Sequence, residues 1–127
     1  MISMVVFDSS LVIDALKKKK AARDLIASNA EKERIAITII SKYEILRGTD
    51  PKDFNLVTEW LDQFVVYNVD DNALEEIVKA YKKLADKGKL INELDILIAG
   101  IASANNEILI TTDKDFLNLE SPRIAVL

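Results

Sequence analysis

The chain has 127 residues, of which half are hydrophobic and 30% are charged, as expected for a globular domain with a substantial core. We therefore expect one domain over residues 1–127. Cysteine is absent, which excludes a disulfide framework, a thiolate nucleophile and a Cys-ligated metal. Histidine is absent too, which excludes a Ser-His-Asp triad and the usual zinc ligands. Any catalysis must use carboxylates, hydroxyls, lysines or a hard cation such as Mg²⁺ or Mn²⁺.

The net charge of −4 comes from 17 basic and 21 acidic residues. Nucleic-acid-binding proteins are often strongly basic. Five of the acids, however, are candidates for one metal site, and without them the balance is slightly positive. The charge is therefore weak evidence against a nucleic-acid substrate. No apolar run has the length of a membrane span, and residues 1–3 lack the basic start of a signal peptide, so we expect a cytoplasmic protein without a membrane partner.

In the first half of the chain, two apolar runs predict buried strands. The first run, residues 4–7, leads into Asp8, and a helical pattern follows over residues 11–16. Four lysines at 17–20 are interpreted as a solvated helix end. The second run, residues 34–40, is β-branched and precedes a short helix in which Ser41 and Glu44 have the spacing of a capping box. Gly48 is a plausible stop for that helix.

In the second half, helical spacing over residues 54–64 is followed by a short strand at 65–69 and an amphipathic helix at 72–85. Residues 86–91 are a predicted loop. Residues 92–95 open a helix over 96–104 that is apolar almost all round and therefore central. A strand at 108–112 leads into Asp113 and Asp115, and residues 122–127 form a terminal strand. This alternation predicts an α/β protein, with a parallel sheet covered by helices on both faces.

Carboxylates follow or flank the predicted strands. Each acid alone has a structural explanation: Asp8 caps a helix, Glu44 closes a capping box, and Asp95 interacts with the dipole of its own helix. If the strands before Asp8 and Asp113 are neighbours, however, both acids lie at the switch point of the sheet, where ligands bind. Clustered carboxylates repel one another and are tolerated mainly around a cation, so metal-assisted phosphoryl chemistry is the favoured interpretation.

Four segments in this order resemble the PIN-domain ribonucleases, especially the VapC-like toxins of toxin–antitoxin pairs. They are residues 5–10 (VVFDSS), 41–48 (SKYEILRG), 95–99 (DILIA) and 109–116 (LITTDKDF). The resemblance implies a three-layer α/β/α sandwich with strand order 3-2-1-4-5. Gly100 departs from it, because alanine is common there, and we expect this glycine to loosen the central helix slightly.

The resemblance also implies roles for individual residues. Asp8, Asp95 and Asp113 would hold Mg²⁺ or Mn²⁺, and Glu44 would orient or deprotonate the attacking water. Supporting positions fall on Ser9 (or Ser10), Thr112 and Asp115. Cations that flank the site and could hold RNA phosphates are Lys42, Arg47, Lys87 and Lys89, although an ordinary solvated surface charge remains the alternative for each of them.

The function implied is a metal-dependent endoribonuclease that cleaves single-stranded or structured RNA, as the toxin of a pair. Its partners would be a second copy, in a homodimer, and a small cognate antitoxin. The alternatives are a PIN nuclease in RNA processing and a PIN-like binding module without catalysis. Aspartyl-phosphate chemistry fits poorly, since it requires a second acid two residues after the first, where this chain has Ser10.

Overall fold

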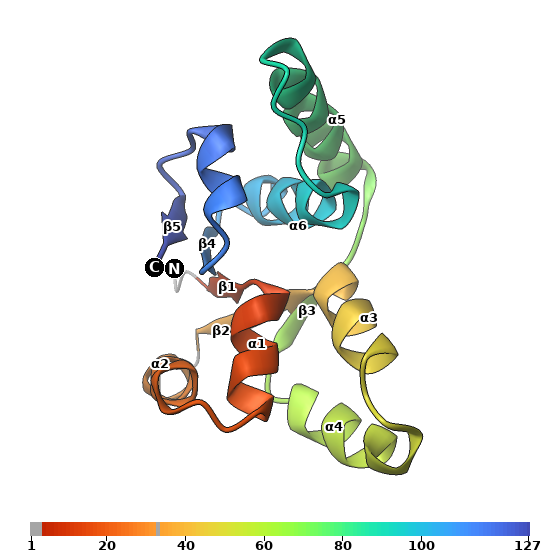
Figure 1. Ribbon diagram of the computed structural model, residues 1–127, viewed down its shortest axis with the longest axis vertical. Coiled ribbons are helices and arrows are strands. Elements are labelled where there is room, and N and C mark those ends of the chain that lie inside the picture. Colours follow the sequence, from red (N-terminus) through yellow and green to blue (C-terminus); the bar gives the residue numbers. More distant parts are fainter. Residues whose placement is uncertain (1–3, 33) are drawn as a thin grey trace.

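The computed structural model describes residues 4–32 and 34–127 and contains one five-stranded sheet (Figure 1). The strands lie in the order β3-β2-β1-β4-β5, and every neighbouring pair is parallel. The α/β class and the strand order 3-2-1-4-5 are therefore confirmed. The strands are β1 (Val5–Phe7), β2 (Ile35–Thr38), β3 (Val65–Tyr67), β4 (Ile108–Thr111) and β5 (Ile124–Val126).

Helices cover both faces of this sheet. Those of the first half are α1 (Ser9–Leu16), α2 (Lys20–Ala30), α3 (Ile39–Arg47), the 3-10 turn η1 (Pro51–Asp53) and α4 (Phe54–Leu61). Those of the second half are α5 (Asp71–Asp86), α6 (Glu93–Ala104) and the 3-10 helix η2 (Lys114–Leu119). In Figure 1, α1, α2 and α4 lie on one side of the strands, and α5, α6 and η2 lie on the other. Within the described chain, no helix combines the length and the apolarity needed to cross a bilayer.

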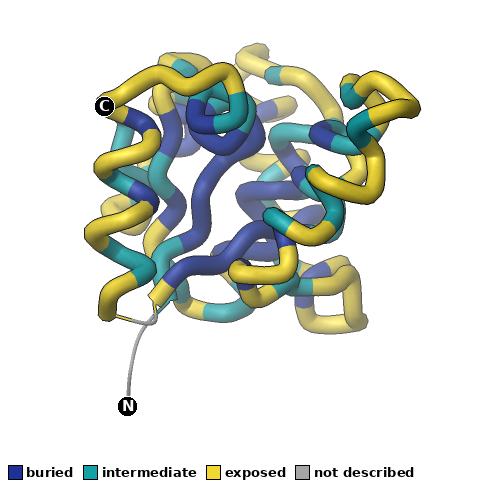
Figure 2. Tube along the Cα trace, turned by 90° about the horizontal axis from the view of Figure 1, so that it is seen from below, coloured by how far each residue is buried: buried dark blue, intermediate teal, exposed yellow. Residues whose placement is uncertain are grey.

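The strands supply side chains to two separate cores, because successive residues of a strand point to opposite faces. Phe7 and Ile37 pack with α1 and α4, whereas Val6 and Leu109 pack with α5 and α6. All four side chains are buried, and Figure 2 shows the strands as buried segments crossing the middle of the molecule. Burial on both faces explains why these strands appear in the sequence as continuous apolar runs.

The second strand is shorter than predicted, and this changes the start of α3. Thr38 ends β2 in an extended conformation and caps α3, its hydroxyl accepting a hydrogen bond from the Ser41 backbone N–H at 3.1 Å. The buried strand predicted over residues 34–40 is therefore confirmed for Ile35–Thr38, but its end and the capping box from Ser41 to Glu44 are wrong. The β-branched run continues past the strand, and the cap outweighs the β propensity of its last residues, Ile39 and Ile40.

The lysine run of residues 17–20 is exposed, as expected. Residues 17–19 lie between α1 and α2, and Lys20 is the first residue of α2. Lys18 has a left-handed backbone there, with a φ of 64°.

Gly100 lets α5 and α6 pack in direct backbone contact. A Cβ atom on Gly100 would lie 2.6 Å from the Cα atom of Ile77 and 2.7 Å from its backbone nitrogen. Neither backbone atom can move away by a change of rotamer. The expectation from helix propensity alone is therefore incomplete, because the missing side chain of Gly100 is what allows this close packing.

We predict that Gly100→Ala lowers the free energy of unfolding by about 1–2 kcal/mol. Overpacking costs about 1–3 kcal/mol, and the better helix propensity of alanine returns up to about 1 kcal/mol. Urea denaturation measures the change. Gly48→Ala is the matched control, because its Cβ would meet only the carbonyl oxygens of Glu44 and Ile45, at ordinary distances of 3.6 and 3.8 Å. A loss at Gly100 no larger than that at Gly48 would contradict the packing argument.

Candidate functional site

The pairing of β1 with β4 builds the centre of the site. Phe7 is aligned with Ile110, so the residues that follow, Asp8 and Thr111, lie side by side at the carboxyl edge of the sheet. Asp8 is only 3% exposed. Its carboxylate accepts hydrogen bonds from the Thr111 hydroxyl at 2.7 Å, the Ser9 N–H at 2.8 Å and the Ser10 hydroxyl at 3.1 Å. Asp8 therefore caps α1 and also occupies the switch point of the sheet.

Buried hydroxyls connect Glu44 to the same edge. The Ser9 hydroxyl donates to the Glu44 carboxylate at 2.8 Å and lies 2.9 Å from the Ser41 hydroxyl. The Ser41 hydroxyl oxygen in turn lies 3.4 Å from that of Thr38. We call Thr38, Ser41 and Ser9 the hydroxyl chain. Because of it, Glu44 points toward α1 and does not return to the start of its own helix.

The turn after β4 adds two further acids. Asp113 caps η2, its carboxylate accepting a hydrogen bond from the Asp115 N–H at 2.9 Å. The Asp113 N–H donates to the Thr111 hydroxyl at 3.0 Å. The Thr112 hydroxyl lies 3.3 Å from that of Ser10. The turn is thereby connected to Asp8 through the hydroxyls of Thr111 and Ser10.

Asp95 lies in the first turn of α6, after Asn92, which caps that helix. Burial raises the pKa of Asp95 to about 7, together with the negative charges of the four other acids, Asp8, Asp113, Glu44 and Asp115. Burial also raises the pKa of Asp8, although its hydrogen-bond donors oppose the increase. The structure therefore brings the four other predicted acids within electrostatic reach of Asp95.

The four predicted cations lie in two places. Lys42 and Arg47 belong to α3, where the Arg47 guanidinium lies 5.1 Å from the centre of the exposed Tyr43 ring. Lys87, after α5, forms an ion pair with Glu120 at 2.9 Å, and Lys89 lies near enough to lower the pKa of Glu120 slightly further.

The C-terminal end of η2 is held by lysines of the α5 region. Lys83 donates to the Leu119 carbonyl at 2.6 Å, and Lys87 donates to the Asn118 carbonyl at 3.3 Å. Lys87 therefore already has intramolecular partners, with which an RNA phosphate would compete.

The sequence prediction missed Thr111, Ser41 and Thr38 as members of the site. All three side chains are fully buried. The signal for Thr111 was available, since a hydroxyl at the end of a strand that neighbours β1 must lie beside Asp8. Ser41 and Thr38 were hidden by the incorrect end of β2.

The five acids have the chemistry of a site for a hard cation. Their hard oxygen donors suit Mg²⁺ or Mn²⁺, and their mutual repulsion, evident at Asp95, favours a cation among them. Among residues 4–32 and 34–127, however, no three acidic side chains are close enough together to form a metal cluster as they stand. The chemistry of the donors therefore fits the ion, and the carboxylates would have to turn toward it.

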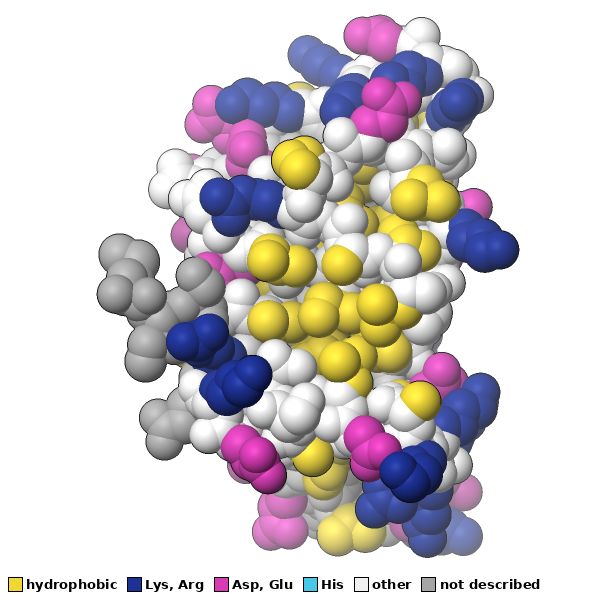
Figure 3. All heavy atoms as spheres, turned by 90° about the vertical axis from the view of Figure 1, so that its left-hand side faces the viewer, with side chains coloured by type: hydrophobic (Ala, Val, Ile, Leu, Met, Phe, Trp, Pro, Cys, Tyr) yellow, Lys and Arg dark blue, Asp and Glu magenta, His cyan; other side chains and the backbone are white. Residues whose placement is uncertain are grey.

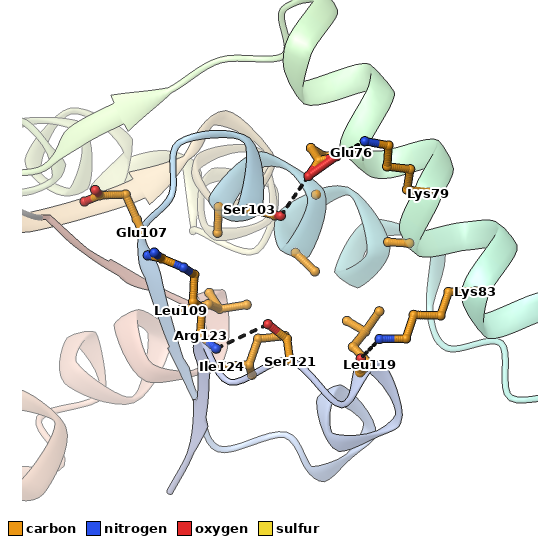
Figure 4. A pocket seen from close by; sticks show the side chains of 14 residues that line it. Glu76, Lys79, Lys83, Ser103, Glu107, Leu109, Leu119, Ser121, Arg123 and Ile124 are labelled. Atoms are coloured by element: carbon orange, nitrogen blue, oxygen red, sulfur yellow. Dashed lines mark hydrogen bonds and ion pairs between the residues drawn. The ribbon is translucent and has the colours of Figure 1, made fainter.

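A cavity of about 210 Å³ lies elsewhere, between α5, α6, η2 and β5 (Figure 4). Its lining contains none of the five acids. Glu76 bonds to Ser103 and Lys79 there, and Lys83 bonds to Leu119. One lining atom, Glu107 Oε2, is buried without a hydrogen-bond partner. The cavity is separate from the candidate site, because none of the five acids lines it.

We predict that Asp95→Asn stabilises the metal-free protein at high pH. Because its folded pKa is near 7 and its ordinary pKa is 3.8, Asp95 costs nothing below pH 4, and its cost grows as the pH rises to about 7. At pH 8 the variant should gain on the order of 1–2 kcal/mol after solvent screening of this partly exposed group. At pH 4 the two proteins should be equal.

Urea denaturation in EDTA at pH 4, 6 and 8 measures this difference. Glu93→Gln is the matched control, since Glu93 is an exposed acid of the same first turn. If Asp95 is only a partner of the helix dipole, its replacement should instead cost a few tenths to about 1 kcal/mol, like that of Glu93.

Comparisons with known proteins agree with this geometry. The PIN domain family model matches residues 5–121. Ribonuclease VapC1 of Methanocaldococcus jannaschii is 28% identical over 113 residues, which are 88% of this chain and 77% of that protein.

Two solved structures have the same fold. They are VapBC2 from Rickettsia felis bound to a DNA fragment from their promoter (TM-score 0.83, 21% identity, 98% and 97% of the two chains) and DNA-bound VapBC from Salmonella typhimurium (TM-score 0.83, 20% identity, 99% and 98%). Since the family model spans nearly all of the sequence and the strand order agrees, the chain belongs to the PIN domain family.

Proposed function

We propose that this protein is a metal-dependent endoribonuclease and acts in the cytoplasm as the toxin of a toxin–antitoxin pair. One observation carries the proposal: at the switch point of a PIN-domain sheet, burial and the negative charges of four neighbouring carboxylates raise the pKa of Asp95 to about 7. A chain without histidine and cysteine has few other means of hydrolysing a phosphodiester. The similarity to a protein named Ribonuclease VapC1 supports the same reaction.

The acids would have separate roles. Asp8, Asp95 and Asp113 would hold Mg²⁺ or Mn²⁺, and the bound ion would supply Lewis-acid stabilisation of the phosphate charge. Ser9, Ser10 and Thr111 keep the Asp8 carboxylate in place through three hydrogen bonds.

Glu44 would orient the attacking water or take its proton, because its carboxylate is held at the same edge by Ser9. Asp115 and Thr112 would support the turn that carries Asp113. The phosphates of the RNA would be held by the cations flanking this edge, Lys42, Arg47, Lys87 and Lys89.

We further propose two partners, a second copy of this chain and a small antitoxin. The solved structures with the same fold include VapBC complexes, which supports an antitoxin partner for this chain as well. Apolar surface for both partners is available. Hydrophobic side chains gather on the face that carries β5 and the C-terminus (Figure 3), and Ile108 and Leu127 are 46% and 65% exposed. A small neighbouring reading frame whose product copurifies with this chain would support the antitoxin, and its absence would count against it.

Helix α5 offers a surface suited to a second copy. Leu74, Val78 and Tyr81 are exposed and lie on one side of the helix, at positions i, i+4 and i+7. Charges flanking this stripe change sign along the helix, with Asp71 and Glu75 in its first half and Lys79 and Lys82 in its second half. Two copies packed antiparallel would pair the acids of one helix with the lysines of the other.

We predict that RNA cleavage requires a divalent cation. EDTA should abolish cleavage of single-stranded RNA by the purified protein, and Mg²⁺ or Mn²⁺ should restore it. Asp8→Asn should lower the rate about 100-fold or more, because it removes charge that acts on the reacting centre. Asp62→Asn, which changes an exposed acid after α4, should leave the rate unchanged. Equal activity in EDTA would refute the mechanism.

We also predict a dimer that depends on α5. Light scattering at high protein concentration should give twice the mass of the chain, and Val78→Glu should return the mass to that of a monomer. Leu56→Glu is the control, since Leu56 is 69% exposed on α4, away from this stripe. A monomeric wild type would contradict the dimer, and a dimer that tolerates Val78→Glu would contradict the surface.

A further inference from the structure

The hydroxyl chain joins the end of β2 to a carboxylate of the site and is closed to water. Thr38 and Ser41 are 0% exposed and Ser9 is 6% exposed. Successive oxygen atoms are 3.4 Å apart from Thr38 to Ser41, 2.9 Å from Ser41 to Ser9 and 2.8 Å from Ser9 to Glu44. Three buried hydroxyls from β2, α3 and α1 thus converge on one partly exposed acid.

The number of protons fixes the direction of these bonds. Each hydroxyl has one proton, and an ionised Glu44 can only accept. The Ser9 hydroxyl is oriented to donate to both Glu44 and Ser41, but it has only one proton. That proton goes to the charged acceptor, Glu44, so the Ser9 oxygen accepts the proton of Ser41. The Ser41 oxygen then accepts from Thr38, whose own oxygen accepts the Ser41 backbone N–H at 3.1 Å. In this order every proton is donated once, and bonds aligned in one direction strengthen one another.

Ser41 is the member on which this order depends. It is the only link between Thr38 and Ser9 within the chain of bonds described above. Without its hydroxyl, Ser9 has no buried donor and can rotate away from Glu44. The Ser41 N–H, which a capping box would offer to Glu44, is bonded to Thr38, and the described donor to the Glu44 carboxylate is the Ser9 hydroxyl.

We propose that Ser41 is a positioning residue of the nuclease site, which holds the Glu44 carboxylate toward the attacking water through Ser9. This inference rests on the proposed ribonuclease function. Ser41 touches neither substrate nor metal in this scheme and acts only through its neighbour. Asp8 does not depend on it, because Asp8 has its own three donors.

The test is a double-mutant cycle on RNA cleavage. Ser41→Ala should lower kcat about 10- to 100-fold and change KM less than about twofold, as expected when a group that orients a catalytic side chain is lost. In a Glu44→Gln background the same substitution should change kcat less than about twofold, because the group it positions is already lost. An equal loss in both backgrounds would overturn the proposal, as would full activity of Ser41→Ala.

Two further variants distinguish the loss of positioning from a folding defect. Ser41→Cys keeps a weak donor of similar size and should recover part of the activity lost in Ser41→Ala; no recovery would count against the proposal. Thr49→Val is the matched control, since the Thr49 hydroxyl donates to the Ile45 carbonyl at the far end of α3 and has no link to Glu44. It should retain wild-type kcat, and a loss equal to that of Ser41→Ala would overturn the specific role of Ser41.

A structural measurement tests the positioning role of Ser41 independently of RNA cleavage. In crystal structures, Glu44 of the wild type should occupy one rotamer bonded to Ser9, and Glu44 of Ser41→Ala should occupy several. If the wild type does not cleave RNA, the proposed function fails, and the Glu44 rotamers still decide whether Ser41 positions this carboxylate. A single unchanged rotamer in Ser41→Ala would overturn the positioning role.

Discussion

The parallel pairing of β1 with β4 is the contact on which the rest of the site depends. It joins the first strand of the chain to the fourth, so that Asp8 and Thr111, which are 103 residues apart in the sequence, become neighbours. Their register places Asp8 beside Thr111, and the turn that follows Thr111 carries Asp113 and Asp115 to the same edge. A shift of one residue would turn Thr111 to the opposite face of the sheet and leave Asp8 buried without its shortest hydrogen bond.

Asp8 and Asp95, two carboxylates at this edge, differ in the hydrogen bonds that compensate for their burial. Asp8 is more deeply buried, and three donors compensate for the water it has lost. The pKa of Asp95 is raised by burial and by four neighbouring negative charges, without a compensating donor among the causes of its shift. The fold therefore contains one acid that is satisfied and one that is strained. Such unrelieved strain is expected where a protein keeps a group for its chemistry and not for its stability.

Much of the fold could be predicted from the sequence, because the strands are buried on both faces and appear as short apolar runs. The strand order came from the resemblance to PIN domains, since periodicity alone does not order strands. All five acids could be proposed as site residues from the sequence, because the chain has no histidine that would be an alternative candidate. Thr111 and Ser41 were missed because their importance lies in partners that are 103 and 32 residues away.

The packing role of Gly100 also depends on a partner that is distant in the sequence. A glycine within a helix indicates a weaker helix when the sequence is considered alone. Only the position of Ile77 on the neighbouring helix shows that the missing Cβ makes room for backbone. The prediction of a capping box was wrong for a related reason. Ser41 and Glu44 have the required spacing, but Thr38 is the residue that caps the helix.

The lysines of the α5 region connect this helix to η2, the 3-10 helix that follows Asp113. Lys83 and Lys87 hold the last carbonyls of η2, and Asp113 caps the other end of this six-residue helix. A partner that draws these lysines away, or acetylation that neutralises them, would release one end of η2. The turn carrying Asp113 would then be anchored from one side only. The outer surface of α5 and the acidic edge are thus mechanically coupled, although they share no residue.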